Sequence, residues 1–104
     1  MSGVTIFAPS SAIPRHFHNC DEVVYLLEGH GIAEIEGEEH LVAKGDVSFI
    51  PEGVPHCFRN ASATEQMKIY WTYDSLDATR TILATGVTTR IEDELRLGIG
   101  AGGI

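Results

Sequence analysis

Residues 16 to 22 contain three side chains that bind metal ions in proteins. His16 and His18 are separated by one residue, so on a β-strand both rings project from the same face, roughly 7 Å apart along the chain. Glu22 follows after Asn-Cys-Asp, a segment typical of a turn or bulge that brings the carboxylate back beside the rings. His56 opens another extended stretch after the proline-glycine loop at 51–55.

Three imidazoles and one carboxylate are ligands suited to one divalent transition metal ion: iron, manganese, nickel, copper or zinc. A six-coordinate ion held by four protein atoms keeps two positions for water, substrate or dioxygen, as catalysis requires. Each residue also has an ordinary explanation, because single histidines are most often surface or hydrogen-bonded residues and Glu22 is one of 15 acidic residues. We assign His30 and His40 that ordinary role. The metal site therefore depends on the residues around the candidate ligands.

Those surrounding residues resemble the two motifs of the cupin family. The first, H-x-H-x(3)-E-x(6)-G, is matched by His16, His18, Glu22 and Gly29. The second, G-x(5)-P-x-G-x(2)-H-x(3)-N, is matched by Gly45, Pro51, Gly53, His56 and Asn60. One position departs from the pattern, because the family usually has a glycine six residues before the first histidine and Ser10 stands there. The resemblance covers about residues 10–72.

This resemblance implies an all-β fold, the double-stranded β-helix or jelly-roll cupin barrel, with His16, His18, Glu22 and His56 as the metal ligands inside it. The composition agrees, because 11 glycines and 4 prolines divide the chain into short apolar stretches. We expect strands at 3–8, 22–27, 32–35, 40–43, 47–50, 56–60 and 67–73. The chain reads as one domain, 1–104, with a C-terminal extension, 74–104. In that extension we expect a β-like patch at 81–84, one charged helical turn, and disorder at the glycine-rich end.

Strand alternation separates the expected interior from the surface. Within 67–73, the odd-numbered side chains form the better interior face. The same parity predicts that Phe58, Ile69 and Trp71 line a substrate pocket. Tyr25, Phe49 and Tyr73 are expected in the core. Cys57 is out of phase with His56, so we expect it to be a buried, inert thiol that points away from the ion.

The formal net charge of −8 disfavours nucleic acid and anionic membranes as partners. No apolar stretch approaches the length of a membrane span, and the N-terminus does not resemble a signal peptide, so we expect a cytoplasmic protein. Cys20 and Cys57 lack C-x-x-C spacing, and in a reducing compartment we expect no bridge between them. We further expect a homodimer, formed by pairing of the N-terminal strand or of the patch at 81–84.

The leading functional hypothesis is a metal-dependent enzyme acting on a small oxygenated molecule, such as a carboxylate, dicarbonyl or enol. Its chemistry would be of the dioxygenase type or of the isomerase or decarboxylase type, with Glu22 changing between ligand and catalytic base. The alternative is a non-catalytic ligand-binding or sensor protein with a structural metal. A metal-free sugar isomerase or epimerase of the same architecture fits poorly, because all four ligand positions are filled.

Overall fold

The architecture, given by a computed structural model that describes residues 1–97, consists of two antiparallel β-sheets and one short helix. The four-stranded sheet contains, in spatial order, β1 (Ser2–Phe7), β8 (Met67–Tyr73), β3 (Glu22–Glu28) and β6 (Val47–Ile50). The six-stranded sheet contains β10 (Thr88–Arg90), β9 (Thr79–Ile82), β2 (His16–His18), β7 (His56–Asn60), β4 (His30–Ile35) and β5 (Glu38–Ala43). The helix α1 (Ile91–Leu97) follows β10. The all-β prediction is confirmed.

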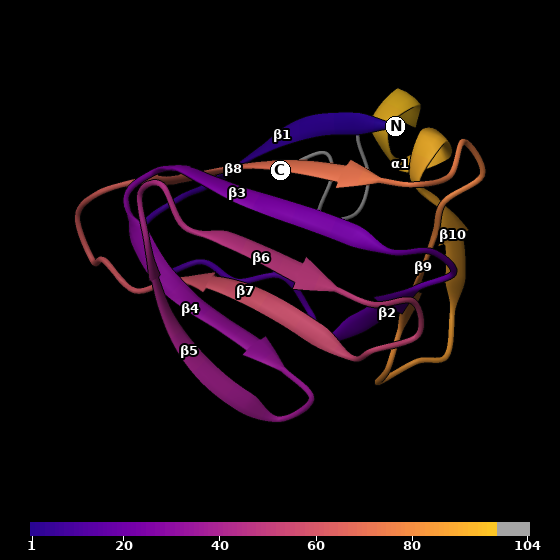
Figure 1. Ribbon diagram of the computed structural model, residues 1–104, viewed down its shortest axis with the longest axis horizontal. Coiled ribbons are helices and arrows are strands. Elements are labelled where there is room, and N and C mark those ends of the chain that lie inside the picture. Colours follow the sequence, from indigo (N-terminus) through magenta and orange to yellow (C-terminus); the bar gives the residue numbers. More distant parts are fainter. Residues whose placement is uncertain (98–104) are drawn as a thin grey trace.

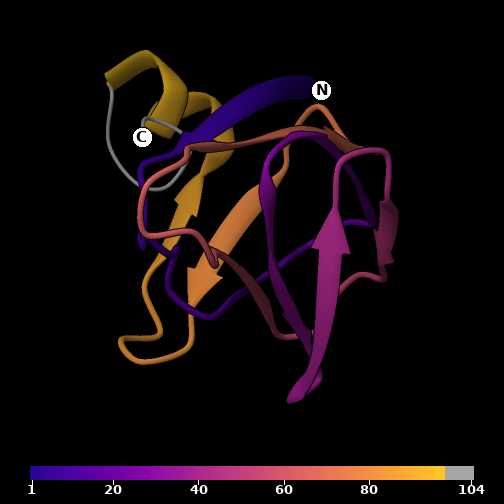
Figure 2. The same ribbon diagram turned by 90° about the vertical axis from the view of Figure 1, so that its left-hand side faces the viewer.

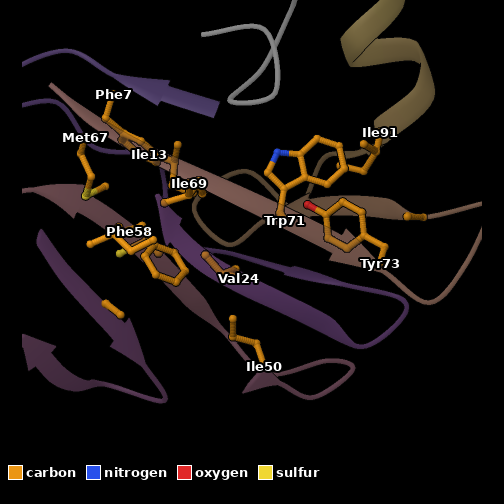
Figure 3. Packing of buried hydrophobic residues seen from close by; sticks show 14 of the residues in the cluster. Phe7, Ile13, Val24, Ile50, Phe58, Met67, Ile69, Trp71, Tyr73 and Ile91 are labelled. Carbon is orange, nitrogen blue, oxygen red and sulfur yellow. The ribbon is translucent and has the colours of Figure 1, made fainter. Parts of the chain in front are cut away.

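The two sheets face each other (Figures 1 and 2), and the hydrophobic core lies between them (Figure 3). The four-stranded sheet contributes inward side chains such as Val24 and Met67, and the six-stranded sheet contributes Phe58. Figure 3 shows Trp71 and Tyr73 beside each other on β8, with ring centroids 5.0 Å apart. None of the helices in the described part of the chain has the length and apolar character needed to cross a membrane.

Alternation along the strands explains which sequence-based predictions hold. Strands at 47–50, 56–60 and 67–73 have the predicted bounds, and the odd-numbered residues of β8 are all buried. Tyr25 and Phe49 were expected in the core, and this expectation is wrong: they are 39% and 59% exposed. Glu22, Val24 and Leu26 take the inward positions of β3, so Tyr25 between them points outward. Ile50 likewise takes the inward position next to Phe49 on β6.

The C-terminal extension is part of the six-stranded sheet. The β-like patch predicted at 81–84 overlaps β9, which begins two residues earlier, at Thr79, and ends at Ile82; residues 83–84 belong to the following turn. β9 pairs with β2 on one side and β10 on the other, so it has no free edge for pairing with a second chain. β1 does lie at the edge of its sheet. The predicted helical turn is α1, whereas the glycine-rich end, 98–104, lies outside the described residues.

Two turns show what the motif glycines do. Gly29 has a φ of +86°, and a Cβ there would lie 2.6 Å from the backbone oxygen of Gln66. Ser10, at the position where the cupin motif usually has glycine, also adopts the left-handed conformation, with a φ of 61°. A residue with a Cβ is strained in this region. The departure at Ser10 therefore leaves the shape of the turn intact at a cost in stability.

Replacing Ser10 with glycine should stabilise the protein. Glycine removes the left-handed strain but loses more backbone entropy on folding, so we expect Ser10→Gly to raise the free energy of unfolding by about 0.5–1 kcal/mol. Urea denaturation measures the change. Ser11→Gly is the matched control, because it removes the hydrogen bond from Ser11 Oγ to Ala8 O (2.8 Å) and should lower stability. If Ser10→Gly lowered the free energy of unfolding as much as Ser11→Gly does, the backbone at Ser10 would not be strained.

Candidate metal centre

The three predicted histidine ligands meet in the interior. His16 and His18 lie on β2, and His56 lies on β7 directly opposite His16. Their ring centroids are 4.4–5.0 Å apart, and one ring nitrogen of each lies within 4.8 Å of the others. All three residues are buried. The fold thus brings His56, from the second motif, beside His16 and His18, although His16 and His56 are 40 positions apart in the sequence.

Backbone carbonyls orient all three rings. Nδ1 of His16 lies 2.7 Å from Pro14 O, Nδ1 of His18 lies 2.8 Å from Thr79 O, and Nδ1 of His56 lies 2.9 Å from Val54 O. A carbonyl oxygen only accepts hydrogen bonds, so each Nδ1 carries the proton and donates it. Each neutral ring then keeps a lone pair on Nε2, which is the arrangement of metal-binding histidines.

Glu22 reaches the same point from the opposite sheet. It begins β3, and its Oε1 lies 3.1 Å from His56 Nε2 and 3.3 Å from His18 Nε2. With the ring protons on Nδ1, these contacts join lone pairs on nitrogen and oxygen, which repel unless a cation or a shared proton lies between them. The donor chemistry therefore fits a divalent ion held by three imidazole nitrogens and one carboxylate.

The electrostatics of the cluster favour its metal-binding protonation state. Burial, followed by the proximity of His56, Arg80 and His18, lowers the pKa of His16 to about 2, so this ring is neutral at physiological pH. Burial raises the pKa of Glu22, but the interaction of its carboxylate with a proton shared with Nε2 of His18 or His56 outweighs burial and holds that pKa at about 2. A neutral imidazole and an ionised carboxylate are the forms that bind metals.

A small cavity adjoins the cluster, between the two sheets. Its free space of about 20 Å³ holds one or two water molecules. The predicted pocket residues Phe58, Ile69 and Trp71 all contribute to its wall, beside His16, Glu22 and His56. Figure 3 shows the three apolar side chains in the interior between the sheets. Trp71 is fixed by a hydrogen bond from its Nε1 to Thr5 Oγ1 (2.9 Å).

Tyr73, which we expected to be a core residue, also belongs to the site. It is buried, as predicted, but its hydroxyl lies 3.4 Å from His18 Nε2 and its ring centroid is 4.6 Å from that of His18. Burial, and then the charge of Glu22, raise the pKa of Tyr73, so its hydroxyl keeps its proton. Strand parity indicated an inward side chain, but nothing in the sequence showed that its polar end would reach a histidine.

The C-terminal extension supplies two features that sequence reasoning missed. Thr79 on β9 provides the carbonyl that orients His18. Arg80 lies opposite His18 in the β2–β9 pair and lines the same cavity as the histidines. The role of Thr79 could not be predicted from the residue type, because every residue has a backbone carbonyl. The one signal for Arg80 was a cationic residue within the otherwise β-like TRTI segment.

The loop at 51–55 is anchored to the segment between His18 and Glu22. Gly53 N donates to His18 O (3.0 Å), and Glu52 N donates to Asp21 Oδ1 (2.8 Å). This anchoring fixes the loop that leads into His56. Cys57 points away from the cluster, as parity predicts, and its thiol donates to Glu34 Oε2 (3.2 Å). Cys57 and Cys20 are both buried and free, so no bridge joins them.

Several known proteins are similar to this chain in sequence or in fold. A protein of Aquifex aeolicus (strain VF5) is 31% identical over 82 residues, which cover 77% of this chain and 68% of that protein. The plu4264 protein from Photorhabdus luminescens superposes with a TM-score of 0.67 at 28% identity, over 72% of this chain and 62% of that chain. Salicylate 1,2-dioxygenase from Pseudoaminobacter salicylatoxidans shares the fold, with a TM-score of 0.64 at 20% identity, and this chain covers 19% of its length.

The model of the cupin domain family matches residues 3–73. That segment contains both motifs and all four side chains that meet in the interior. The two facing sheets are those of the jelly-roll barrel that the resemblance implied. The chain belongs to the cupin family.

Proposed function

We propose that this protein is a metal-dependent enzyme that acts on a small oxygenated molecule, with His16, His18, Glu22 and His56 holding one divalent transition metal ion. The observation that carries the proposal is the convergence of three carbonyl-oriented imidazoles and one buried carboxylate beside a cavity. On a six-coordinate ion, four protein donors leave two coordination positions free for water or substrate, whereas a closed structural site has none.

When bound, the ion would act as a Lewis acid on a carboxylate, dicarbonyl or enol. Side chains of the protein form the cavity beside the candidate ion site. Phe58, Ile69 and Trp71 form an apolar wall that limits water. The Tyr73 hydroxyl, beside His18, is a protonated donor that can hydrogen-bond to an oxygen in the cavity. The small volume favours a small molecule over a polymer.

The two roles considered for Glu22 are not equally supported. A pKa of about 2 makes its carboxylate a weak base, because a general base works best with a pKa near the operating pH. The same ionised carboxylate is a good metal ligand. We therefore propose that Glu22 acts as a ligand in the resting site, with a role as base only where coordination changes release it.

The type of reaction depends on the metal. The shared fold with salicylate 1,2-dioxygenase is compatible with dioxygenase-type chemistry on a cupin barrel, although fold alone does not assign a reaction. In an isomerisation or decarboxylation, the ion would act as the same Lewis acid, and no dioxygen would be needed. Iron, nickel or copper in the native protein would favour oxygen chemistry, whereas zinc or manganese would favour the others.

Removing one histidine ligand should abolish tight metal binding and leave the fold intact. Because loss of even an outer hydrogen-bond partner of a metal ligand costs about 10–100-fold in affinity, we expect His56→Ala to weaken Co²⁺ or Mn²⁺ binding by more than about 100-fold. Isothermal titration calorimetry measures the affinity. His40→Ala is the matched control, since His40 lies exposed on β5.

Two results would count against a catalytic metal centre. Equal metal affinity in His56→Ala and His40→Ala would show that the cluster is not the binding site. Unfolding of the wild-type protein on chelation, followed by circular dichroism, would instead favour the alternative of a structural metal. We expect the chelated protein to keep its β-sheet spectrum, because the strands pair through backbone hydrogen bonds and the apolar core is made of residues other than the four candidate ligands.

The metal-free protein should lose stability in acid. His16 has a folded pKa of about 2 and an ordinary value of 6.5, so below pH 6.5 the unfolded chain binds a proton that the folded chain does not. Stability should then fall by up to about 1.4 kcal/mol per pH unit. Glu22, with its pKa lowered from 4.5 to about 2, adds a further loss below pH 4.5.

Urea denaturation of the chelated protein between pH 7.5 and 5 tests this prediction. His16→Gln should flatten the profile in this range, whereas the exposed His40→Gln should leave it unchanged. A flat wild-type profile would show that His16 is not buried in its neutral form.

A further inference from the structure

Arg80 is a buried cation in the wall of the metal-site cavity. It lies on β9 directly opposite His18, so both side chains are on the inner face of the sheet. Its side chain is 7% exposed, and it lines the cavity together with His16, Glu22 and His56. It lies outside residues 3–73, the part of the chain that matches the cupin domain.

The hydrogen bonding of Arg80 is incomplete. Its Nη1 donates to Glu94 Oε1 on α1 (2.5 Å), and Glu94 is itself buried. Its Nε has no hydrogen-bond partner among the residues whose side chains the structure describes, 1–95. A guanidinium has five N–H donors, and a buried ion pair is often no more stabilising than apolar residues of the same volume. Stability alone therefore gives little reason for a guanidinium at this position.

The charges around the cavity favour one further negative charge. Within the described chain, Glu22 and Arg80 are the charged residues of the wall, and Glu94 is the partner of Arg80. Two carboxylates and one guanidinium sum to −1. A divalent ion changes this sum to +1, which one monoanion neutralises. Without the ion, the site repels anions.

We propose that Arg80 recognises the carboxylate of a small monoanionic substrate bound beside the metal ion. This inference rests on the proposed metal-dependent function and narrows its substrate class to monocarboxylates. A planar guanidinium matches the geometry of a carboxylate. Glu94 holds the guanidinium in place from α1, so the C-terminal extension determines what the centre binds.

Formate and its neutral analogue formamide are suitable probes, since both have three heavy atoms and the cavity is small. The Co²⁺-loaded protein is titrated with each, and the visible absorption of Co²⁺ reports binding. The test variant is Arg80→Gln/Glu94→Gln, which removes both charges of the pair and leaves the net charge of the site unchanged. The matched control is Arg90→Gln/Glu92→Gln, which removes an exposed pair (2.9 Å) from the same extension.

We expect the Arg80 double variant to bind formate at least tenfold more weakly than wild type, with formamide binding unchanged. The control should match wild type for both probes. Formate affinity equal in wild type and the Arg80 double variant would overturn the assignment, as would a wild-type protein that binds Co²⁺ but not formate. A wild-type protein that does not bind Co²⁺ would overturn the proposed function itself.

A second variant keeps the test decisive if the double variant fails to fold. Arg80→Lys keeps the charge and a partner for Glu94 but loses the planar fork. We expect it to weaken formate binding at least fivefold. Unchanged formate binding in Arg80→Lys would show that the guanidinium does not contact the anion.

A separate observation concerns the outer face of the four-stranded sheet. Seven large apolar side chains on it are 39–61% exposed: Val4, Ile6, Val23, Tyr25, Val47, Phe49 and Tyr70. Strand register places Val4 opposite Tyr70, Tyr70 opposite Tyr25, and Tyr25 opposite Val47. The apolar surface is therefore continuous across β1, β8, β3 and β6. We call it the outer apolar face.

Size and charge indicate what covers this face. Its exposed apolar side-chain area is on the order of 600 Å², at the upper end for a monomer and near the roughly 800 Å² that each partner buries in a standard interface. The chain carries a net charge of −8, which disfavours contacts between two copies through their charged surface and leaves the outer apolar face as the surface on which they can meet. At the border of the outer apolar face, Lys68 pairs with Glu28 (3.5 Å), so the face adds no net charge to a contact.

We infer that two copies of this chain pack their outer apolar faces against each other. This mode differs from the strand-edge pairing expected from the sequence, for which β9 has no free edge and β1 does. Such a contact is self-complementary under a twofold axis.

Light scattering at micromolar concentration tests the dimer. Wild type should have twice the 11.3 kDa chain mass, and Tyr25→Lys/Phe49→Lys should be a monomer. Leu41→Lys, a change at an 86% exposed leucine on β5, should remain a dimer. A monomeric wild type, or a dimer that survives both lysines on the outer apolar face, would overturn this inference.

Discussion

The candidate metal centre depends on three hydrogen bonds that fix the imidazoles of His16, His18 and His56. Each ring gives its Nδ1 proton to a backbone carbonyl, and the lone pairs of the Nε2 atoms remain for the interior. Together with the Glu22 carboxylate from the opposite sheet, the three Nε2 atoms form a cluster of lone-pair donors that contains no positively charged group. A cation balances this arrangement, and that is the physical basis for assigning a metal centre.

The hydrogen bonds that orient the histidines also explain the architecture around them. Pro14 and Val54 each lie two residues before the histidine they orient, so local chain geometry suffices for His16 and His56. His18 depends on Thr79, which lies 61 positions away on β9. The C-terminal extension is therefore part of the centre. It completes the six-stranded sheet beside β2, orients one ligand and places Arg80 in the cavity wall.

The resemblance to the two cupin motifs predicted which four side chains would come together, and local patterns predicted the strands that carry them. H-x-H spacing, strand alternation and the loop before His56 are visible in short windows, and the bounds of β6, β7 and β8 follow from them. The contributions of Thr79, Arg80 and Glu94 were not predictable, because they arise from pairing between segments far apart in the chain. Tyr25 and Phe49 were misplaced because hydrophobicity alone does not identify the face of a strand, and the outer face of this sheet is also apolar.

The central claim is that Glu22 and the three histidines bind one ion between the two sheets. The most direct test is a crystal structure of the protein loaded with Mn²⁺ or Co²⁺, with anomalous scattering recorded at the absorption edge of the metal. The account predicts one anomalous peak per chain, bonded to Nε2 of His16, His18 and His56 and to a carboxylate oxygen of Glu22. A peak coordinated by other residues, or a loaded crystal with no peak at this cluster, would contradict it.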